Sequence, residues 1–560
     1  MTDAFPAALT GPTSKERKYD RQLRLWAATG QQALEDSHVL LVNSDGPLGQ
    51  YNTGVTGVAG VETLKNLVLP GIGGFTIVDP AIVTESDLGV NFFLEGESLG
   101  KSRAEETCRL LKELNPDVEG YYYVKRVEEL LTDPDFLPQH KLVIISGPMR
   151  RSTLVPLTQE AKQLGIPVLY LHSVGFFSTF SVQLPAEFPI VETHPDPEST
   201  QDLRLLNPWP ELVAAAAGLN NLDTLDDHQH GHVPYLLLLL HFLEQWKHSH
   251  EGKAPSNYKE KTEFREFVRS QARTSNPEGG EENFDEAAAA VLKTITPFSL
   301  RSSIREIFEM DQCRQLSASS QDFWVIASAI KTFHASHGVL PLPGSLPDMK
   351  AQSADYVSLQ NIYKTKARQD VEEVTATVRH LESQLQRQTP AIPDRDIEVF
   401  CKNAAHIKVV LGRDIPQISI DSDASTLKTI RNELGVPDSL IPIFIAMQIL
   451  DSVVDEIQSS SREEERSVDD DALWNSHTER ILALLTGADG SAVCQEARAQ
   501  IARASKELRR AEGGELHNIS SLTGGLVAQE ALKVLTRQYG PLDNTCVFDG
   551  ARSKSEMYRL

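Results

Sequence analysis

Cysteine is scarce in this chain. The 560 residues include only five cysteines, at positions 108, 313, 401, 494 and 546. They form no C-x-x-C pair, so the sequence gives no support for a cysteine-bound zinc ion. A sparse, odd-numbered set of cysteines is typical of proteins that stay in a reducing compartment. We therefore expect a cytoplasmic or nuclear protein.

Positive charge and long apolar runs are also lacking. The chain has 54 lysines and arginines against 78 acidic residues, which gives a net charge of −24. Nucleic-acid binding needs clustered basic residues, so this balance argues against nucleic acid as the main partner. The longest apolar stretch, residues 235–243, is far shorter than the roughly 20 residues of a membrane helix. Residues 1–15 lack the apolar core of a signal peptide, and we expect no membrane association.

The sequence does contain a segment of nucleotide-binding type at residues 38–79. His38–Asn43 is a short apolar run of the kind that forms a buried parallel strand. Five glycines follow within residues 44–60, and glycine lets a backbone approach a ligand closely. A helical pattern to Val68 and a strand at Phe75–Asp79 complete a βαβ unit, in which phosphate meets amides at a helix N-terminus. The glycines form no G-x-G-x-x-G motif, so they could equally build a loop that binds nothing.

Strands and helices alternate through the rest of the first 184 residues. Further strands are predicted at 142–146, 166–171 and 176–184, with a helix at 154–164. The pattern returns at the end of the chain, with a helix at 522–538 and a strand at 544–549. This alternation is typical of an α/β fold with a doubly wound, mostly parallel sheet.

The middle of the chain has a different character. Prolines are frequent from residue 185 to 210, and helical patterns without strands follow at 233–248, 258–272, 284–294, 321–334 and 355–386. We therefore predict four parts: a disordered N-terminus at 1–17, the first part of the sheet domain at 18–184, a large helical insert at 185–505, and the last helix and strand of the sheet domain at 506–560.

Residues 18–26, with the sequence KYDRQLRLW, begin the ordered part. Tyr19, Leu23 and Trp26 share one helical face that can pack on the sheet. Arg21 and Arg24 lie one helical turn apart. They are either solvated surface arginines or an arm directed at a phosphate group.

Several segments together resemble one known family. They are Lys18–Trp26 (KYDRQLRLW), Glu62–Gly73 (ETLKNLVLPGIG), Pro347–Met349 (PDM), Leu359–Tyr363 (LQNIY) and Gly524–Glu530 (GGLVAQE). The first two resemble segments of the ubiquitin-like-modifier activating enzymes. The other three resemble one branch of that family, the regulatory subunit of the heterodimeric Nedd/Rub-activating enzyme. The long helical insert also favours this branch over its SUMO-type counterpart.

The resemblance implies a Rossmann-like adenylation fold of the MoeB/ThiF type, split by an insert that lacks the active cysteine. It implies a catalytic partner subunit that binds ATP and magnesium, adenylates the C-terminal glycine of the Nedd/Rub modifier, and accepts the modifier on a cysteine. The present chain would be the regulatory subunit of that heterodimer. It would be non-catalytic alone and would hold no cofactor or metal, while its insert would help to bind the modifier.

Two departures from the active pattern agree with this implication. Active adenylation domains of the family carry an Asn-x-x-Arg motif after the acid-tipped strand, whereas residues 87–93 contain no arginine. They also carry a magnesium-binding aspartate after a later strand, where residues 146–150 read SGPMR. The reaction depends on neutralising phosphate charge with metal and cations, so we predict that this chain cannot run it alone.

The resemblance assigns one residue of this chain a place in the reaction. It implies that Arg21 reaches the partner's ATP in trans, where a planar and permanently charged guanidinium suits a phosphate. The alternative is that Arg21 pairs with an acid at the dimer interface. Cys313 and Cys401 have no clear activating group nearby in the sequence, and we expect both thiols to be inert.

Two other functions stay open from the sequence. The chain could be a self-sufficient ATP- or dinucleotide-binding enzyme of the MoeB/ThiF type that uses the loop at 44–60. It could also be a pure scaffold, in which Arg21 has no role.

Overall fold

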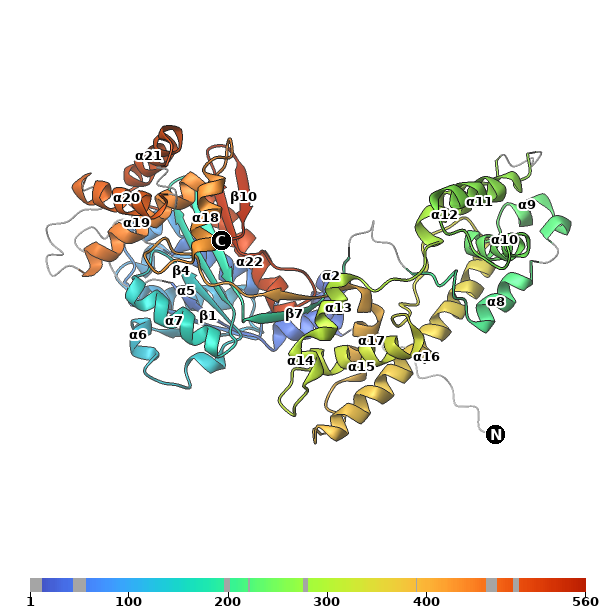
Figure 1. The fold of residues 1–560 in the computed structure, drawn as a ribbon. Coiled ribbons are helices and arrows are strands. Elements are labelled where there is room, and N and C mark those ends of the chain that lie inside the picture. Colours follow the sequence, from blue (N-terminus) through green and yellow to red (C-terminus); the bar gives the residue numbers. More distant parts are fainter. Residues whose placement is uncertain are drawn as a thin grey trace, which may run out of the picture. The chain divides into compact units, whose positions relative to one another are not determined.

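The computed structural model describes residues 13–43, 57–195, 202–219, 222–274, 280–388, 390–459, 471–486 and 493–560. The chain divides into two compact units, one formed by residues 1–190 and 409–560 and the other by residues 191–408 (Figure 1). Residues 44–56 lie outside the described part, so the expected glycine-rich loop enters the structure only at Gly57.

The first unit is built on an eight-stranded sheet. In spatial order its strands are β10 (Lys554–Tyr558), β9 (Thr545–Asp549), β6 (Phe177–Gln183), β5 (Val168–Val174), β4 (Leu142–Ser146), β1 (His38–Val42), β2 (Gly74–Val78) and β3 (Glu119–Tyr123). Strands β1 to β5 pair in parallel, whereas β6, β9 and β10 are antiparallel to their neighbours. The predicted α/β fold with a mostly parallel sheet is confirmed.

The central strands follow directly from the apolar runs in the sequence. Strands β2, β4 and β5 are buried along their whole length, as expected when helices cover both faces of a parallel sheet. The strands predicted at 38–43, 75–79, 142–146 and 544–549 are confirmed to within one residue at each end. The strand predicted at 166–171 runs from Val168 on to Val174, and the one at 176–184 is the antiparallel β6.

The edge strands β3 and β10 were not predicted from the sequence. Strand β3 has the sequence EGYYY, and all of its residues are exposed or half-buried. Sequence patterns find strands by their buried side chains, so a strand at the solvated edge of a sheet gives a weak signal.

Helices of the same unit surround the sheet. They are α1 (Ser14–Lys18), α2 (Asp20–Glu35), α3 (Val58–Val68), α4 (Glu85–Val90), α5 (Arg103–Leu114), α6 (Val127–Leu130), α7 (Arg151–Gln163), α18 (Ala424–Glu433), α19 (Ile441–Ser459), α20 (Asp471–Leu484), α21 (Gln495–Arg510) and α22 (His517–Thr536). Val39 and Leu41 of β1 belong to one core with α3, α5 and α22, whereas Leu40 and Val42 belong to another with α7. This alternation shows that the sheet is doubly wound.

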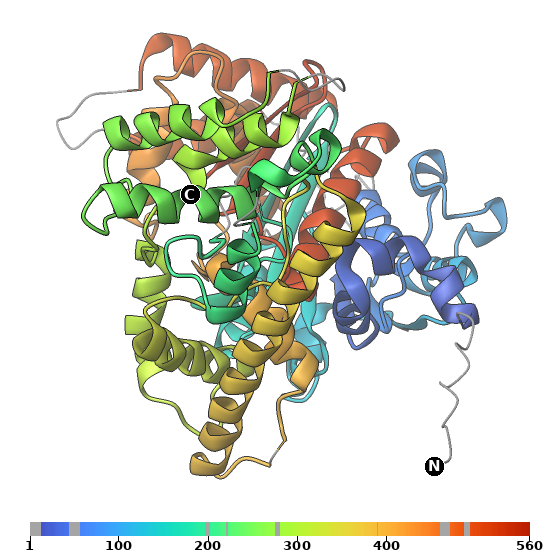
Figure 2. The same ribbon diagram turned by 90° about the vertical axis from the view of Figure 1, so that its right-hand side faces the viewer.

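The two ends of the chain meet on the α3 face of the sheet. Helix α22, red in Figure 2, packs along α3 and lies beside the N-terminal α2. The Gln538 side chain, just after α22, donates a hydrogen bond to the Trp26 carbonyl at 2.9 Å. The sheet unit is therefore split in sequence, as predicted.

The end of the helical insert differs from the expected boundary at 505. Helices α18 to α21 fall within residues 409–560 and belong to the sheet unit. Their core includes Val174, Phe177 and Val547 of the sheet. A helical pattern predicts a helix but does not show which surface the helix packs on, so these helices were assigned to the insert. The insert of the structure is residues 191–408.

The N-terminus also differs in part from the expectation of disorder at 1–17. Helix α1 begins at Ser14, and Thr13 and Glu16 form a capping box that satisfies its first amides. The rest of the expected disordered segment, residues 1–12, lies outside the described residues.

The second unit is helical, as predicted. Its helices are α8 (Pro210–Ala217), α9 (Asp227–His230), α10 (Tyr235–Ser249), α11 (Tyr258–Ser270), α12 (Glu282–Thr294), α13 (Ser302–Glu309), α14 (Asp311–Arg314), α15 (Asp322–His337), α16 (Ser353–Gln384) and α17 (Asp394–Lys402). Where the chain passes between the units, β7 (Glu187–Val191) and β8 (Ile407–Leu411) form a separate two-stranded sheet. Among the described residues, no helix combines the length and apolar character needed to cross a membrane.

A glycine-to-alanine pair in α22 tests the packing of α22 on α3. A Cβ atom at Gly524 would lie 2.7 Å from the Cβ of Glu62, whereas one at the neighbouring Gly525 would meet nothing within 4 Å. We expect Gly524→Ala to lower the free energy of unfolding by about 1–3 kcal/mol through overpacking. Gly525→Ala should raise it by roughly 0.5–1 kcal/mol, because alanine favours a helix. Urea denaturation of both variants measures the difference, and equal effects would contradict the close packing.

Candidate functional site

The candidate site lies at the carboxyl ends of β1, β2 and β4. In an open α/β sheet, ligands bind outside the carboxyl ends of the strands, where the chain turns to opposite sides. Here β1 lies between β2 and β4, and the chain continues outward to β3 on one side and β5 on the other. Asn43 follows β1, Asp79 follows β2, and α3 begins beside them at Val58. This is the place where a nucleotide would meet the fold.

Asp79, the acid predicted at the tip of the second strand, is fully buried and fully engaged. Arg103 Nε donates to its Oδ2 at 2.7 Å, and Arg103 Nη2 donates to its Oδ1 at 3.2 Å. Asn43 Nδ2 donates to Oδ2 at 3.0 Å, and the Ala81 amide donates to Oδ1 at 3.0 Å. A carboxylate has about four acceptor positions, so these donors leave none for a ribose hydroxyl.

Arg103 holds two buried carboxylates together. Besides Asp79, its Nη1 donates to Asp87 Oδ1 at 2.8 Å, and all three side chains are at most 4% exposed. Burial alone would raise the pKa of Asp79, but the Arg103 guanidinium and the other donors hold that pKa below its usual value. Burial opposes the charge on Arg103 as well, yet the two carboxylates raise its pKa above its usual value. Asp79 and Arg103 therefore both stay charged at neutral pH.

The N-terminus of α3 is occupied by a carboxylate of the chain itself. The amides of Val58 and Ala59 donate to Glu515 Oε2 and Oε1 at 2.9 and 3.1 Å. Ser520 Oγ donates to Oε1 at 3.0 Å. Helix N-termini attract anions because their first amides are unpaired and the helix dipole is positive there. Glu515 thus takes the position that a nucleotide phosphate would occupy.

The close approach of α3 to β1 depends on Gly57. This residue precedes α3 with φ +63°, and a Cβ atom there would lie 2.4 Å from the Asn43 side chain. Glycine therefore serves here to bring the helix end against Asn43. Its role in the described residues is internal packing.

The two segments that depart from the active pattern also form internal contacts. Asn91 is buried and its Oδ1 accepts from the Phe93 amide at 3.0 Å, while the exposed Phe92 stacks on His517 with ring centroids 3.8 Å apart. At the end of β4, Arg150 pairs with Glu128 at 2.5 Å. Within the described residues, no group of three or more histidine, cysteine, aspartate or glutamate side chains could hold a metal ion.

Arg21 lies apart from this cluster, on the first turn of α2. Its side chain is exposed and makes no hydrogen bond or ion pair with the described residues, whereas Arg24 pairs with Asp20 at 3.0 Å. The helix is fixed beneath it, because Tyr19 is 2% exposed and accepts a hydrogen bond from Asn115 at 3.0 Å. Arg21 is thus held on an ordered helix with its guanidinium in solvent.

Cys313 and Cys401 are buried in the helical unit. Burial raises the pKa of Cys313 to about 11 and that of Cys401 to about 12, so both are protonated thiols at neutral pH. This agrees with the expectation that neither is a nucleophile.

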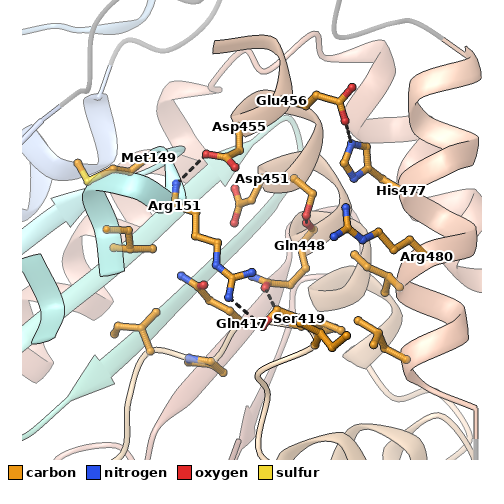
Figure 3. A pocket seen from close by; sticks show the side chains of 18 of the residues that line it. Met149, Arg151, Gln417, Ser419, Gln448, Asp451, Asp455, Glu456, His477 and Arg480 are labelled. Carbon is orange, nitrogen blue, oxygen red and sulfur yellow. Dashed lines mark hydrogen bonds and ion pairs between the residues drawn. The ribbon is translucent and has the colours of Figure 1, made fainter. Parts of the chain in front are cut away.

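A cavity of about 590 Å³ lies between α7, α19 and α20, and sequence patterns did not predict it (Figure 3). Polar contacts in its wall include the Arg151 backbone amide, which donates to Asp455 at 2.8 Å, and the His477 ring, which lies 3.0 Å from Glu456. Residues 149–170 and 415–484 build it together, and such distant segments share no sequence pattern.

The sequence analysis also did not identify Arg103 and Glu515, whose side chains occupy the candidate site. The acid after β2 was recognised, but nothing in the sequence marks Arg103 as its partner. Glu515 is 457 residues away from Val58 in the chain. Only the fold brings these groups together.

Comparisons with known proteins agree with the observed fold, and the matches span almost the whole chain. The family model described as ThiF family matches residues 19–560. A NEDD8-activating enzyme E1 regulatory subunit of Xenopus laevis is 35% identical, with 98% of this chain and 99% of the relative covered. Proteins of the same name from Danio rerio and Drosophila melanogaster are 34% and 36% identical, covering 99% and 98% of this chain and 100% and 98% of the relatives.

Replacing Arg103 tests whether the site is closed by an internal ion-pair cluster. Arg103→Met would leave Asp79 and Asp87 buried without their cation, so we expect a loss of about 3–5 kcal/mol in the free energy of unfolding. Arg109→Met on the same helix is the matched control, because the Arg109 side chain is 45% exposed and ion pairs of exposed side chains contribute little. Chemical denaturation at neutral pH measures both. An effect of Arg103→Met as small as that of Arg109→Met would contradict the role of the cluster.

Proposed function

We propose, from the premise that this chain belongs to the ThiF family and to the NEDD8-activating enzyme E1 regulatory subunits, that it completes a heterodimer without catalysing adenylation itself. In this proposal a catalytic partner subunit binds ATP and magnesium and carries the activated modifier, which is NEDD8 or its Rub counterpart. The present chain contributes its sheet unit to the heterodimer and its helical insert to the surface that holds the modifier. A cytoplasmic or nuclear location remains a prediction from the cysteine content.

One observation carries the non-catalytic role: the chain's own side chains fill the two places that a nucleotide needs. Glu515 accepts the amides at the N-terminus of α3, where a phosphate would bind. Arg103 takes both oxygens of Asp79, where a ribose would bind. A phosphate would have to displace a carboxylate of like charge, and a ribose would have to break a buried ion pair. The residues present do not fit ATP, and the segment after β4 offers no acid for magnesium.

The free guanidinium of Arg21 supports a role in trans. The surface of α2 presents a planar fork of donors that no described residue uses. Such a fork can bind the phosphate of a nucleotide held by another subunit, as an arginine finger does. An acid of the partner at the interface is the competing ligand for the same guanidinium.

The structure weakens the alternative of a self-sufficient ATP- or dinucleotide-binding enzyme, because that enzyme would need the places held by Arg103 and Glu515. The loop at 44–60 that such an enzyme would use falls mostly in residues 44–56, outside the described residues. A pure scaffold remains the second candidate, and only the behaviour of Arg21 separates it from the main proposal.

The proposal is tested by modifier-dependent exchange between ATP and pyrophosphate. We expect no exchange with this chain alone and rapid exchange once a catalytic partner and the modifier are added. The full-length chain is assayed by itself and with an equimolar partner under the same conditions. Sustained exchange by the isolated chain would overturn the non-catalytic role.

Arg21→Ala tests the arm in the reconstituted heterodimer. Loss of a cation from the phosphates should slow exchange by at least about 100-fold, since a trans arginine contributes strongly to phosphate chemistry. Arg21→Lys should restore only part of the rate, because a lysine lacks the planar fork. Arg24→Ala, one turn along the same helix, should leave the rate unchanged. An unchanged rate in Arg21→Ala, with the heterodimer intact by gel filtration, would favour the scaffold.

A further inference from the structure

A second cavity of about 380 Å³ opens at the amino ends of the central strands. The nucleotide-type site lies at their carboxyl ends. Ser37, Lys141 and Pro167 line it, and each immediately precedes a strand: β1, β4 or β5. The end of α22 and Phe188 of β7 complete the wall. All of these residues belong to the sheet unit. The reaction proposed above uses none of them.

Arg537 projects from the end of α22 into the wall of this cavity. It is the residue after the helix and adopts φ +53°, a conformation that asparagine or glycine would take more readily. Its guanidinium lies 4.8 Å from the ring centroid of Phe188, which fixes the planar group by a cation–π contact. The side chain is thereby held in one place and keeps contact with solvent.

Arg537 lacks the acidic partner that several other arginines of the chain have. Acidic partners raise the pKa values of Arg103, Arg109, Arg379 and Arg510. Desolvation instead lowers the pKa of Arg537. Among the described residues no carboxylate pairs with it, although the chain has 78 acidic residues. A guanidinium that lines a cavity, rests on an aromatic ring and lacks a counterion is a natural place for an external anion.

The rest of the lining fits an anion attached to an apolar body. Lys141 supplies a second cation that no described acid neutralises, while Asp36 is the single acid in the wall and accepts a hydrogen bond from Gln32 at 2.8 Å. Burial lowers the pKa of His140 to about 4, so this residue adds no charge at neutral pH. Apolar side chains fill the remaining wall: Pro138, Leu164, Ile166, Phe188, Val534 and Leu535.

We propose that this cavity binds a small organic anion, with its carboxylate or phosphate group on Arg537 and Lys141 and its apolar part against Phe188 and Leu535. Arginine suits such a group because its fork donates two parallel hydrogen bonds to carboxylate or phosphate oxygens. The cavity volume lies near the lower end of the range for small-molecule sites, roughly 300–1,000 Å³. The ligand is thus small and carries one anionic group.

Isothermal titration of the full chain at low salt tests the site with three probes. Phenyl phosphate and phenylacetate carry the two anionic groups on the same apolar body, and inorganic phosphate carries the anion alone. We expect saturable binding of at least one aromatic probe to one site, tighter than inorganic phosphate. The tighter of the two aromatic probes identifies the anionic group. Arg537→Gln should weaken binding by about 10-fold or more, the equivalent of losing a charge-assisted hydrogen bond.

Matched variants separate a binding role from a structural one. Lys141→Gln should weaken binding several-fold without a change in melting temperature, and Arg537→Lys should bind more weakly than the native chain but better than Arg537→Gln. Lys428→Gln removes an exposed cation from α18 and should change nothing. If Arg537→Gln does not fold, Lys141→Gln together with Arg537→Lys decides the result.

The proposal is overturned if the native chain shows no saturable binding of the aromatic probes, or if Arg537→Gln and Lys141→Gln bind them as the native chain does. It is also overturned if a glutamate-rich peptide binds the same residues far more tightly than the small probes, because the cavity would then receive an acidic segment of a protein. Exchange activity of the heterodimer is not part of the readout, so failure here leaves the proposed function untouched.

Discussion

One buried arginine holds together the elements at the carboxyl end of β2. Arg103 lies between Asp79 and Asp87 with almost no solvent contact, and each carboxylate would be strongly unfavourable there without it. The cluster fixes the start of α5 against the end of β2 and against α4. It also uses the acid that the βαβ unit places where a ribose would bind. The same contact therefore stabilises the fold and supports the proposal that this chain does not bind a nucleotide.

A second charged side chain, Glu515 from the C-terminal part of the chain, also occupies the candidate site. Glu515 reaches the first amides of α3, and α22 then packs along the same helix. A carboxylate stabilises a helix N-terminus for the same electrostatic reason that a phosphate does. Here a side chain of the chain itself meets that electrostatic requirement at the start of α3. In the proposed heterodimer, this leaves the arm at Arg21 as the part of the chain that addresses a nucleotide.

The sequence predicted those parts of the structure that depend on local patterns. Buried strands such as β4 appear as continuous apolar runs, and the helices of the insert appear as periodic ones, so both were located well. The edge strand β3 was missed because its tyrosines face solvent. The boundary at 505 was misplaced because α18 to α21 have a helical pattern whether they pack on the sheet or on the insert. Arg103, Glu515 and Arg537 have long-range partners, and a single sequence contains no record of those partners.

The split sheet has a consequence for synthesis on the ribosome. Strand β6 emerges early, but its neighbour β9 follows more than 350 residues later, after the whole insert has been made. Until then the nascent domain has an unpaired strand edge and a bare surface on α3, both of which invite association with other chains. The nascent chain therefore needs protection from aggregation until β9 has been synthesised. A C-terminal truncation that removes β9 and β10 would leave that edge open permanently.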